Sequence, residues 1–168
     1  INLTLKNCTF NAPENTKYAL MLQSTSGITG KVTVEGCTFN GYTRGINLQR
    51  PNTDFVVINN TIRSTASEPD RGAIQLTDGS SFVVTGNTVD VNAGNAFWFH
   101  DAATNSNVTY TISNNDIKAP YIGYSGVTAF DVNTKITSFG NKFNNTDTTK
   151  CMKKGATVAE ATNLTTIH

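Results

Sequence analysis

The sequence predicts an all-β fold, a single-stranded parallel β-helix (solenoid) of about six rungs. The first observation is a motif, complete in Lys31-Val-Thr-Val-Glu-Gly-Cys-Thr-Phe39, that occurs in six copies. The second is a corner column that contains only Asn or Gly. The third is the distance between copies, 23 to 29 residues, which is typical of a solenoid and too short for a propeller blade.

The first half of each copy predicts a strand with one buried face. Residues two apart on a strand point to the same side, and the first and third columns of the motif are mostly apolar. The first column comprises Leu3, Val32, Phe55, Phe82, Tyr110 and Ile136. The third column comprises Leu5, Val34, Val57, Val84, Ile112 and Ser138.

A bend should follow each of these strands. The corner column is Asn7, Gly36, Asn59, Gly86, Asn114 and Gly140. Asn and Gly enter the left-handed region most easily, so we expect φ > 0 at all six positions. The next column is Cys8, Cys37, Asn60, Asn87, Asn115 and Asn141. Small polar side chains stacked in register can hydrogen-bond along the stack.

A second repeated segment follows each corner, after a variable loop rich in turn residues such as Ala12-Pro-Glu-Asn-Thr. Its copies span residues 19–24, 45–50, 73–78, 96–101 and 129–134. Alternation places these side chains inward: Leu20, Leu22, Ile46, Leu48, Ile74, Leu76, Phe97, Phe99, Phe130 and Val132. We therefore expect β-helix repeats over residues 1–145. Residues 146–168 should form a short irregular C-terminal cap or a partial rung of the same domain.

The corner pattern x-Φ-x-Φ-x-[NG]-[NC]-x-Φ, where Φ is apolar, resembles that of the right-handed parallel β-helix in the pectate-lyase-like superfamily. The resemblance covers about residues 1–145. It implies a right-handed coil, as does the general chirality of parallel crossovers. It also implies that a saccharide groove would run along the outward face of the second repeated strand.

Composition and charge limit the classes of partner that the sequence predicts. The net charge of +1 gives no support to nucleic-acid binding, and no run of 18 apolar residues predicts membrane insertion. Abundant Thr, Asn and Gly with 15% charged residues favour a secreted or cell-surface protein. The chain begins inside a strand copy, so we expect it to be part of a longer chain, with end-to-end association a further possibility.

Cys8 and Cys37 occupy one column on adjacent rungs, where their Cα atoms should lie about 5 Å apart. Two alternatives stay open, free buried thiols or a strained disulfide. Cys151 lies in the tail. The chain has no CxxC motif and no His at ligand spacing, so no metal site is predicted.

The outward positions of the second strand predict a shallow polar strip that suits a sugar. Amides and carboxylates can bond the ring edge while an aromatic face lies beneath the ring. Trp98, the only tryptophan, falls on this face, where it either stacks on a ligand or is covered by a neighbouring loop. The predicted ligand-binding residues are Asn47, Gln49, Gln75, Trp98, His100 and Asp101.

Catalysis is the alternative. Asp78 and Asp101 should share a column on adjacent rungs, with Arg50 on the rung before Asp78. His100 lies next to Asp101, and two carboxylates about 5 Å apart suit a retaining glycosidase. A surface Arg–Asp ladder explains the same residues. The catalytic motifs of polygalacturonases and the calcium-binding acidic cluster of pectate lyases have no convincing counterpart, so we expect no cofactor.

The sequence therefore favours a non-catalytic, extracellular, adhesin-type β-helix module that binds a polysaccharide or other glycan. The first alternative is a polysaccharide lyase or glycoside hydrolase of the pectate-lyase-like fold. The second is a purely structural spacer in a surface protein.

Overall fold

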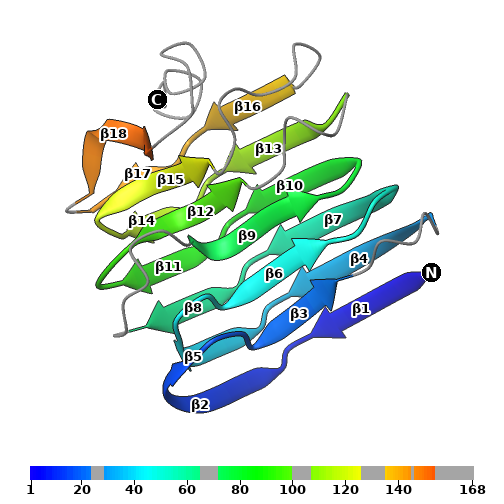
Figure 1. The fold of residues 1–168 in the computed structure, drawn as a ribbon, viewed down its shortest axis with the longest axis horizontal. Coiled ribbons are helices and arrows are strands. Elements are labelled where there is room, and N and C mark those ends of the chain that lie inside the picture. Colours follow the sequence, from blue (N-terminus) through cyan, green and yellow to red (C-terminus); the bar gives the residue numbers. More distant parts are fainter. Residues whose placement is uncertain (24–28, 65–71, 100–106, 126–134, 145, 154–168) are drawn as a thin grey trace.

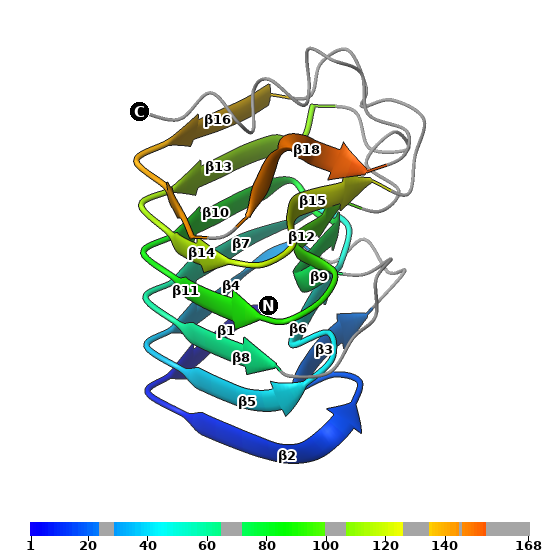
Figure 2. The same ribbon diagram turned by 90° about the vertical axis from the view of Figure 1, so that its left-hand side faces the viewer.

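A computed structural model of the chain describes residues 1–23, 29–64, 72–99, 107–125, 135–144 and 146–153. These residues form a solenoid of three parallel sheets with six strands each (Figure 1). Successive strands of the chain belong to successive sheets, so each circuit of the backbone adds one strand to every sheet (Figure 2). The described residues include no helix that is long and apolar enough to cross a membrane.

The first sheet contains the predicted corner strands: β1 (Asn2–Lys6), β4 (Gly30–Glu35), β7 (Thr53–Ile58), β10 (Ser81–Thr85), β13 (Thr109–Ser113) and β16 (Lys135–Phe139). Neighbouring strands pair in the register of the motif columns. Phe55, Phe82 and Tyr110 of the first column stack inside, with ring centroids 5.2 Å and 5.1 Å apart. The inward face was therefore predicted correctly.

The second sheet follows directly after each corner: β2 (Thr9–Thr16), β5 (Thr38–Tyr42), β8 (Thr61–Ser64), β11 (Thr88–Val91), β14 (Asp116–Lys118) and β17 (Lys142–Phe143). The sequence predicted turns here, and for Ala12-Pro-Glu-Asn-Thr this is wrong because β2 continues to Thr16. β2 is an edge strand of its sheet, where a proline is tolerated because its missing N–H has no ladder partner to satisfy.

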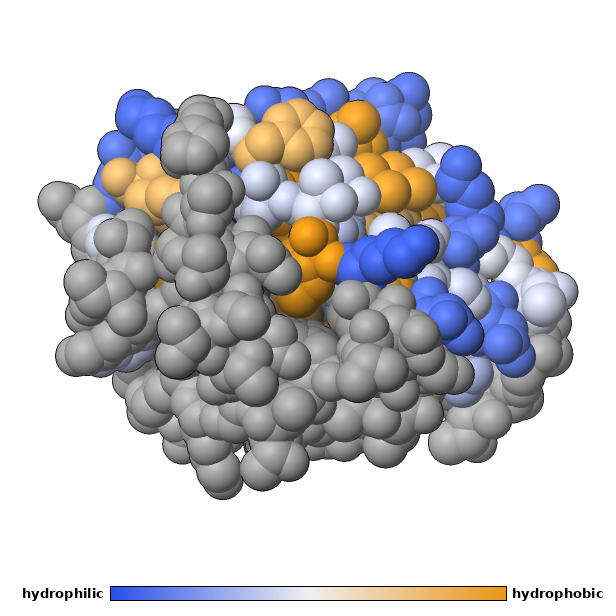
Figure 3. Space-filling view, turned by 90° about the horizontal axis from the view of Figure 1, so that it is seen from above, coloured by the Kyte–Doolittle hydropathy of each residue, from blue (hydrophilic) through white to orange (hydrophobic). Residues whose placement is uncertain are grey.

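The third sheet contains the second repeated segment: β3 (Leu20–Gln23), β6 (Ile46–Gln49), β9 (Gly72–Asp78), β12 (Asn95–Phe99), β15 (Tyr121–Ser125) and β18 (Asp147–Lys153). Its inward side chains are buried from Ile46 to Phe99. Phe130 and Val132 lie outside the described residues. At the C-terminal side β18 pairs with β15 and extends this sheet, and residues 154–168 are outside the described part. Figure 3 looks onto the end of the solenoid that carries β16, β17 and β18, where hydrophobic residues lie among hydrophilic ones on the surface.

All six corner residues have positive φ, from 54° at Asn7 to 67° at Gly86, as predicted. The next column forms an amide ladder, which we define as Asn60, Asn87, Asn115 and Asn141. Each Nδ2 donates to a backbone carbonyl of a neighbouring rung at 2.9–3.0 Å. The first three also donate to the next Oδ1 at 2.8–3.0 Å. Because every ladder member is nine-tenths or more buried, these bonds fix the corner in a water-poor environment.

Candidate functional site

Three predicted ligand-binding residues do form one row across the third sheet. Asn47 pairs with Gln75, and Gln75 pairs with Trp98, on the outward side of β6, β9 and β12. Their exposed fractions are only 4%, 0% and 6%. The strip predicted to be shallow and open is therefore closed at its centre. Of the two alternatives for Trp98, burial is the one observed, and an indole in this position has no free face for a sugar.

The buried row is polar without being fully hydrogen-bonded. Thr77 Oγ1 donates to Asn47 Oδ1 at 3.2 Å. The two amide atoms of Gln75 have no hydrogen-bond partner in the described part of the chain. An unmatched buried amide costs about 1–3 kcal/mol per group, so the rest of the strand packing must offset this penalty. Alternation alone did not predict this double burial, which is typical of parallel sheets covered on both faces.

The predicted column of charged residues beyond this row is not formed as expected. A bulge after Leu48 pairs Gln49 with Asp78, one residue out of the predicted register. Arg50 contacts Asp78 through the backbone, its N–H donating to the Asp78 carbonyl at 2.8 Å. His100 and Asp101 lie outside the described residues. Of the proposed catalytic set, the structure therefore describes only Arg50 and Asp78, and the set as a whole stays a prediction.

An open groove lies instead on the outward face of the second sheet. It crosses β2, β5, β8, β11 and β14, which are stacked one above another (Figure 2). Its cavity volume is about 420 Å³. We call this surface the second-sheet groove, lined by Asn11, Ala12, Asn40, Gly41, Arg63, Ser64, Asp90, Asn92 and Lys118. A smaller hollow of about 270 Å³ continues it past Asn92 and Lys118 toward Pro120.

One in-register column supplies the polar side chains of the groove. Strand pairing places Asn11, Asn40, Arg63, Asp90 and Lys118 beside one another in that order. Asn40 Nδ2 donates to Asn11 Oδ1 at 2.9 Å, and Lys118 Nζ lies 3.1 Å from Asp90 Oδ1. The exposed Arg63 guanidinium makes no ion pair or hydrogen bond with the described residues around it. Since Lys118 neutralises Asp90, Arg63 leaves the groove with a net positive centre.

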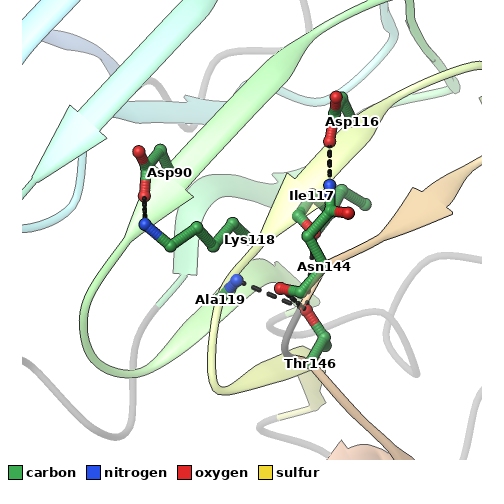
Figure 4. A network of polar contacts seen from close by, with 7 residues as sticks. All are labelled: Asp90, Asp116, Ile117, Lys118, Ala119, Asn144 and Thr146. Atoms are coloured by element: carbon green, nitrogen blue, oxygen red, sulfur yellow. Dashed lines mark hydrogen bonds and ion pairs between the residues drawn. The ribbon is translucent and has the colours of Figure 1, made fainter.

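A polar network between β14 and the residues that follow β17 supports the C-terminal side of the groove (Figure 4). Asn144 donates to Asp116, and Lys142 lies 3.8 Å from the same carboxylate. Thr146 Oγ1 accepts the Ala119 N–H at 3.4 Å and donates to the Asn144 carbonyl at 3.3 Å. These contacts hold the chain beyond β14 against the sheet, next to Lys118.

Among its described residues, the groove brings together neither a set of metal ligands nor a pair of carboxylates for acid–base work. Asp90 is the single carboxylate among its lining residues. In the described ranges, no group of three or more His, Cys, Asp or Glu side chains could hold a metal ion. The chemistry that this surface offers is hydrogen bonding by amides and pairing of an anion with Arg63.

Comparison with known families agrees with this architecture. Residues 2–168 match the family model described as a right handed beta helix region. The chain belongs to the right-handed β-helix family. The coil is accordingly right-handed, and the resemblance to the pectate-lyase-like superfamily is consistent with this membership. No curated protein and no solved structure matches the chain.

Sequence columns could have identified the groove. Each lining residue of the polar column lies one position after the apolar column that ends the motif, as in Phe10-Asn11 and Phe39-Asn40. The missing information was that this position continues a strand. Only a continued strand places five such side chains on one face.

Proposed function

We propose that this β-helix is a non-catalytic, adhesin-type module of an extracellular protein that binds a glycan in the second-sheet groove. The observation that supports the proposal best is the in-register polar column, open to solvent and continuous over five strands. The third-sheet row predicted for this role is buried, so the groove takes its place.

The spacing of the column suits an extended oligosaccharide. Parallel strands lie about 4.8 Å apart, so five strands offer polar side chains over about 19 Å along the solenoid axis. A sugar chain lying along that axis would meet a new amide or charged group at each strand. Asn11, Asn40 and Asn92 each provide both a donor and an acceptor, which is what the hydroxyls of a sugar ring require.

The charges of the groove favour a sugar with an acidic substituent. Arg63 has a planar guanidinium that can bind a carboxylate or sulfate with two parallel hydrogen bonds. Asp90 is already paired with Lys118, so its repulsion of an incoming anion is reduced. The small residues Ala12 and Gly41 leave room for a ring beside these groups.

The proposal does not include catalysis, because glycosidases use two carboxyl groups on either side of the scissile bond. Asp90 has no second carboxylate opposite it among the residues that line the groove. Binding by exposed amides and one arginine should be of moderate affinity, since few apolar surfaces are removed from water.

The test measures binding of the full chain to acidic and neutral oligosaccharides, either by calorimetric titration or on a glycan array. We expect Arg63→Gln to weaken retention of an acidic oligosaccharide about tenfold, because a charge-assisted bond is replaced by a neutral one. Asn40→Ala should weaken acidic and neutral ligands alike. Lys31→Gln is the matched control, since Lys31 is an exposed cation on the first sheet, outside the groove.

Three results would contradict the proposal. Absence of binding to every glycan would favour the structural spacer. Binding that is unaffected by Arg63→Gln and Asn40→Ala would place the site elsewhere. New oligosaccharide products, detected by mass spectrometry after incubation with polysaccharides, would establish the enzyme alternative.

A further inference from the structure

The amide ladder does not continue to the N-terminal end of the solenoid. In its last two positions the column contains Cys37 and Cys8 in place of asparagine. The Cys37 N–H still donates to Asn60 Oδ1 at 2.9 Å, so the ladder pattern reaches the second strand of the first sheet. The next step is different, because the Cys8 N–H donates to Cys37 Sγ at 3.4 Å. Sulfur is a weak acceptor, so this end of the ladder is held less firmly.

The two thiols are arranged identically. Cys8 Sγ donates to the Lys6 carbonyl and Cys37 Sγ donates to the Glu35 carbonyl, each at a distance of 3.4 Å. The backbones on both sides of the cysteines are paired: the Asn7 N–H donates to the Glu35 carbonyl at 2.9 Å, and the Thr38 N–H donates to the Cys8 carbonyl at 2.8 Å. The Cα atoms are thus one strand spacing apart, about 4.8 Å.

We infer that Cys8 and Cys37 form an intramolecular disulfide when the folded protein meets an external disulfide oxidant. A separation of about 4.8 Å falls within the range of Cα distances, roughly 4.4–6.8 Å, that a disulfide spans. Both cysteines are free in this structure. The bond would replace the weak S–H contacts with a covalent link between the first two rungs, at the place where the amides are missing.

The oxidation runs by thiol–disulfide exchange. The Cys8 thiol, which is half-buried, loses its proton, and its sulfur attacks oxidised glutathione, so that one glutathione thiolate leaves. The Cys37 sulfur, after deprotonation, then attacks the Cys8 sulfur of the mixed disulfide, and the second glutathione leaves. In total the protein loses two protons and two electrons, and one glutathione disulfide becomes two thiols.

This order follows from the surroundings of the two groups. Cys37 is buried, and burial raises the pKa of its thiol, so Cys8 is the better first nucleophile. Cys151 is distant from both thiols, because it lies in β18, at one end of the third sheet, whereas Cys8 and Cys37 belong to the first two rungs, where β3 and β6 form the other end of that sheet. The link would close a loop of about 30 residues and thereby restrict the unfolded chain.

The experiment incubates the native full chain with excess oxidised glutathione, then alkylates the remaining thiols under denaturing conditions and maps the peptides. We expect a Cys8–Cys37 linked peptide, with Cys151 alkylated. The oxidised protein should have an unfolding equilibrium constant several-hundred-fold lower, roughly, than the reduced protein, as expected for a loop of this length. Cys8→Ser should abolish this difference, and Cys151→Ser should preserve it.

Several outcomes would overturn the inference. These are three alkylated thiols after prolonged native oxidation, a link that includes Cys151, or a Cys8–Cys37 link that forms only after denaturation. If Cys8→Ser reduces stability by itself, the comparison of oxidised and reduced Cys151→Ser still decides the question. That variant contains only the two thiols concerned.

Discussion

Replacing Asn87 with alanine should reveal how much the amide ladder contributes to stability. Asn87 is 1% exposed, and its Oδ1 accepts the Asn60 backbone N–H at 2.9 Å. Its Nδ2 donates to the Val57 carbonyl at 2.9 Å. Alanine leaves the Asn60 N–H without its acceptor and the Val57 carbonyl without this donor. The backbone N–H of residue 87 still donates to Asn115 Oδ1. Each of these two buried groups loses a hydrogen-bond partner at a cost of about 1–3 kcal/mol, so the free energy of unfolding should fall by about 2–6 kcal/mol.

The assay is equilibrium unfolding in guanidinium, followed by circular dichroism. Thr88→Ala is the control, because Thr88 is the exposed neighbour, and we expect it to change the free energy by less than about 1 kcal/mol. A loss below about 1 kcal/mol in Asn87→Ala, with an unchanged m-value, would refute the reasoning. It would mean that water or a small backbone shift replaces the ladder bonds.

Asn87→Asp tests the direction of the bonds at the same position. A carboxylate keeps the acceptor for Asn60 but cannot donate to Val57, whereas the protonated acid can. Burial would raise the pKa of this carboxyl above its unfolded value of about 3.9. The stability of the variant should therefore be highest below the unfolded pKa and fall as the pH rises through the folded pKa. Equal deficits at pH 4 and pH 7 would contradict this.

Three further predictions concern single positions. Gly86→Ala should lower the free energy of unfolding by about 1–3 kcal/mol in the same assay, because the φ of residue 86 is +67° and the new Cβ would lie 2.3 Å from Asn59 Oδ1. The converse change, Asn59→Gly, should alter the free energy of unfolding by no more than about 1 kcal/mol. Trp98 fluorescence should be quenched by acrylamide far less in the native than in the unfolded protein; equal quenching would show an exposed indole. Burial, and to a smaller extent Asp78, raises the pKa of Tyr110, so its phenol should stay neutral in native alkaline titrations. Stability should fall above pH of about 10, where unfolded tyrosine ionises, and Tyr110→Phe should flatten that slope.

Those parts of the fold that depend on local chemistry could be predicted from the sequence. Positive φ at the corners needs only Asn or Gly, and in-register stacking follows from the identity of the column above and below. The ladder followed from the next column, in which four of the six copies contain asparagine. The second sheet was missed because its strands shorten along the solenoid, from eight residues in β2 to three in β14 and two in β17. Alternation over so few positions does not differ from a loop.

The site was harder to predict because it depends on what covers each face, a property that alternation does not contain. Trp98 and Gln75 are on the outward side as predicted, yet both are buried. A single bulge after Leu48 was enough to move Asp78 out of the column with Arg50. The groove residues escaped notice for the opposite reason, since each is an ordinary surface residue in its own rung. Arg63 becomes a candidate for binding only when the strands place it between Asn40 and Asp90, and no single copy of the repeat carries that information.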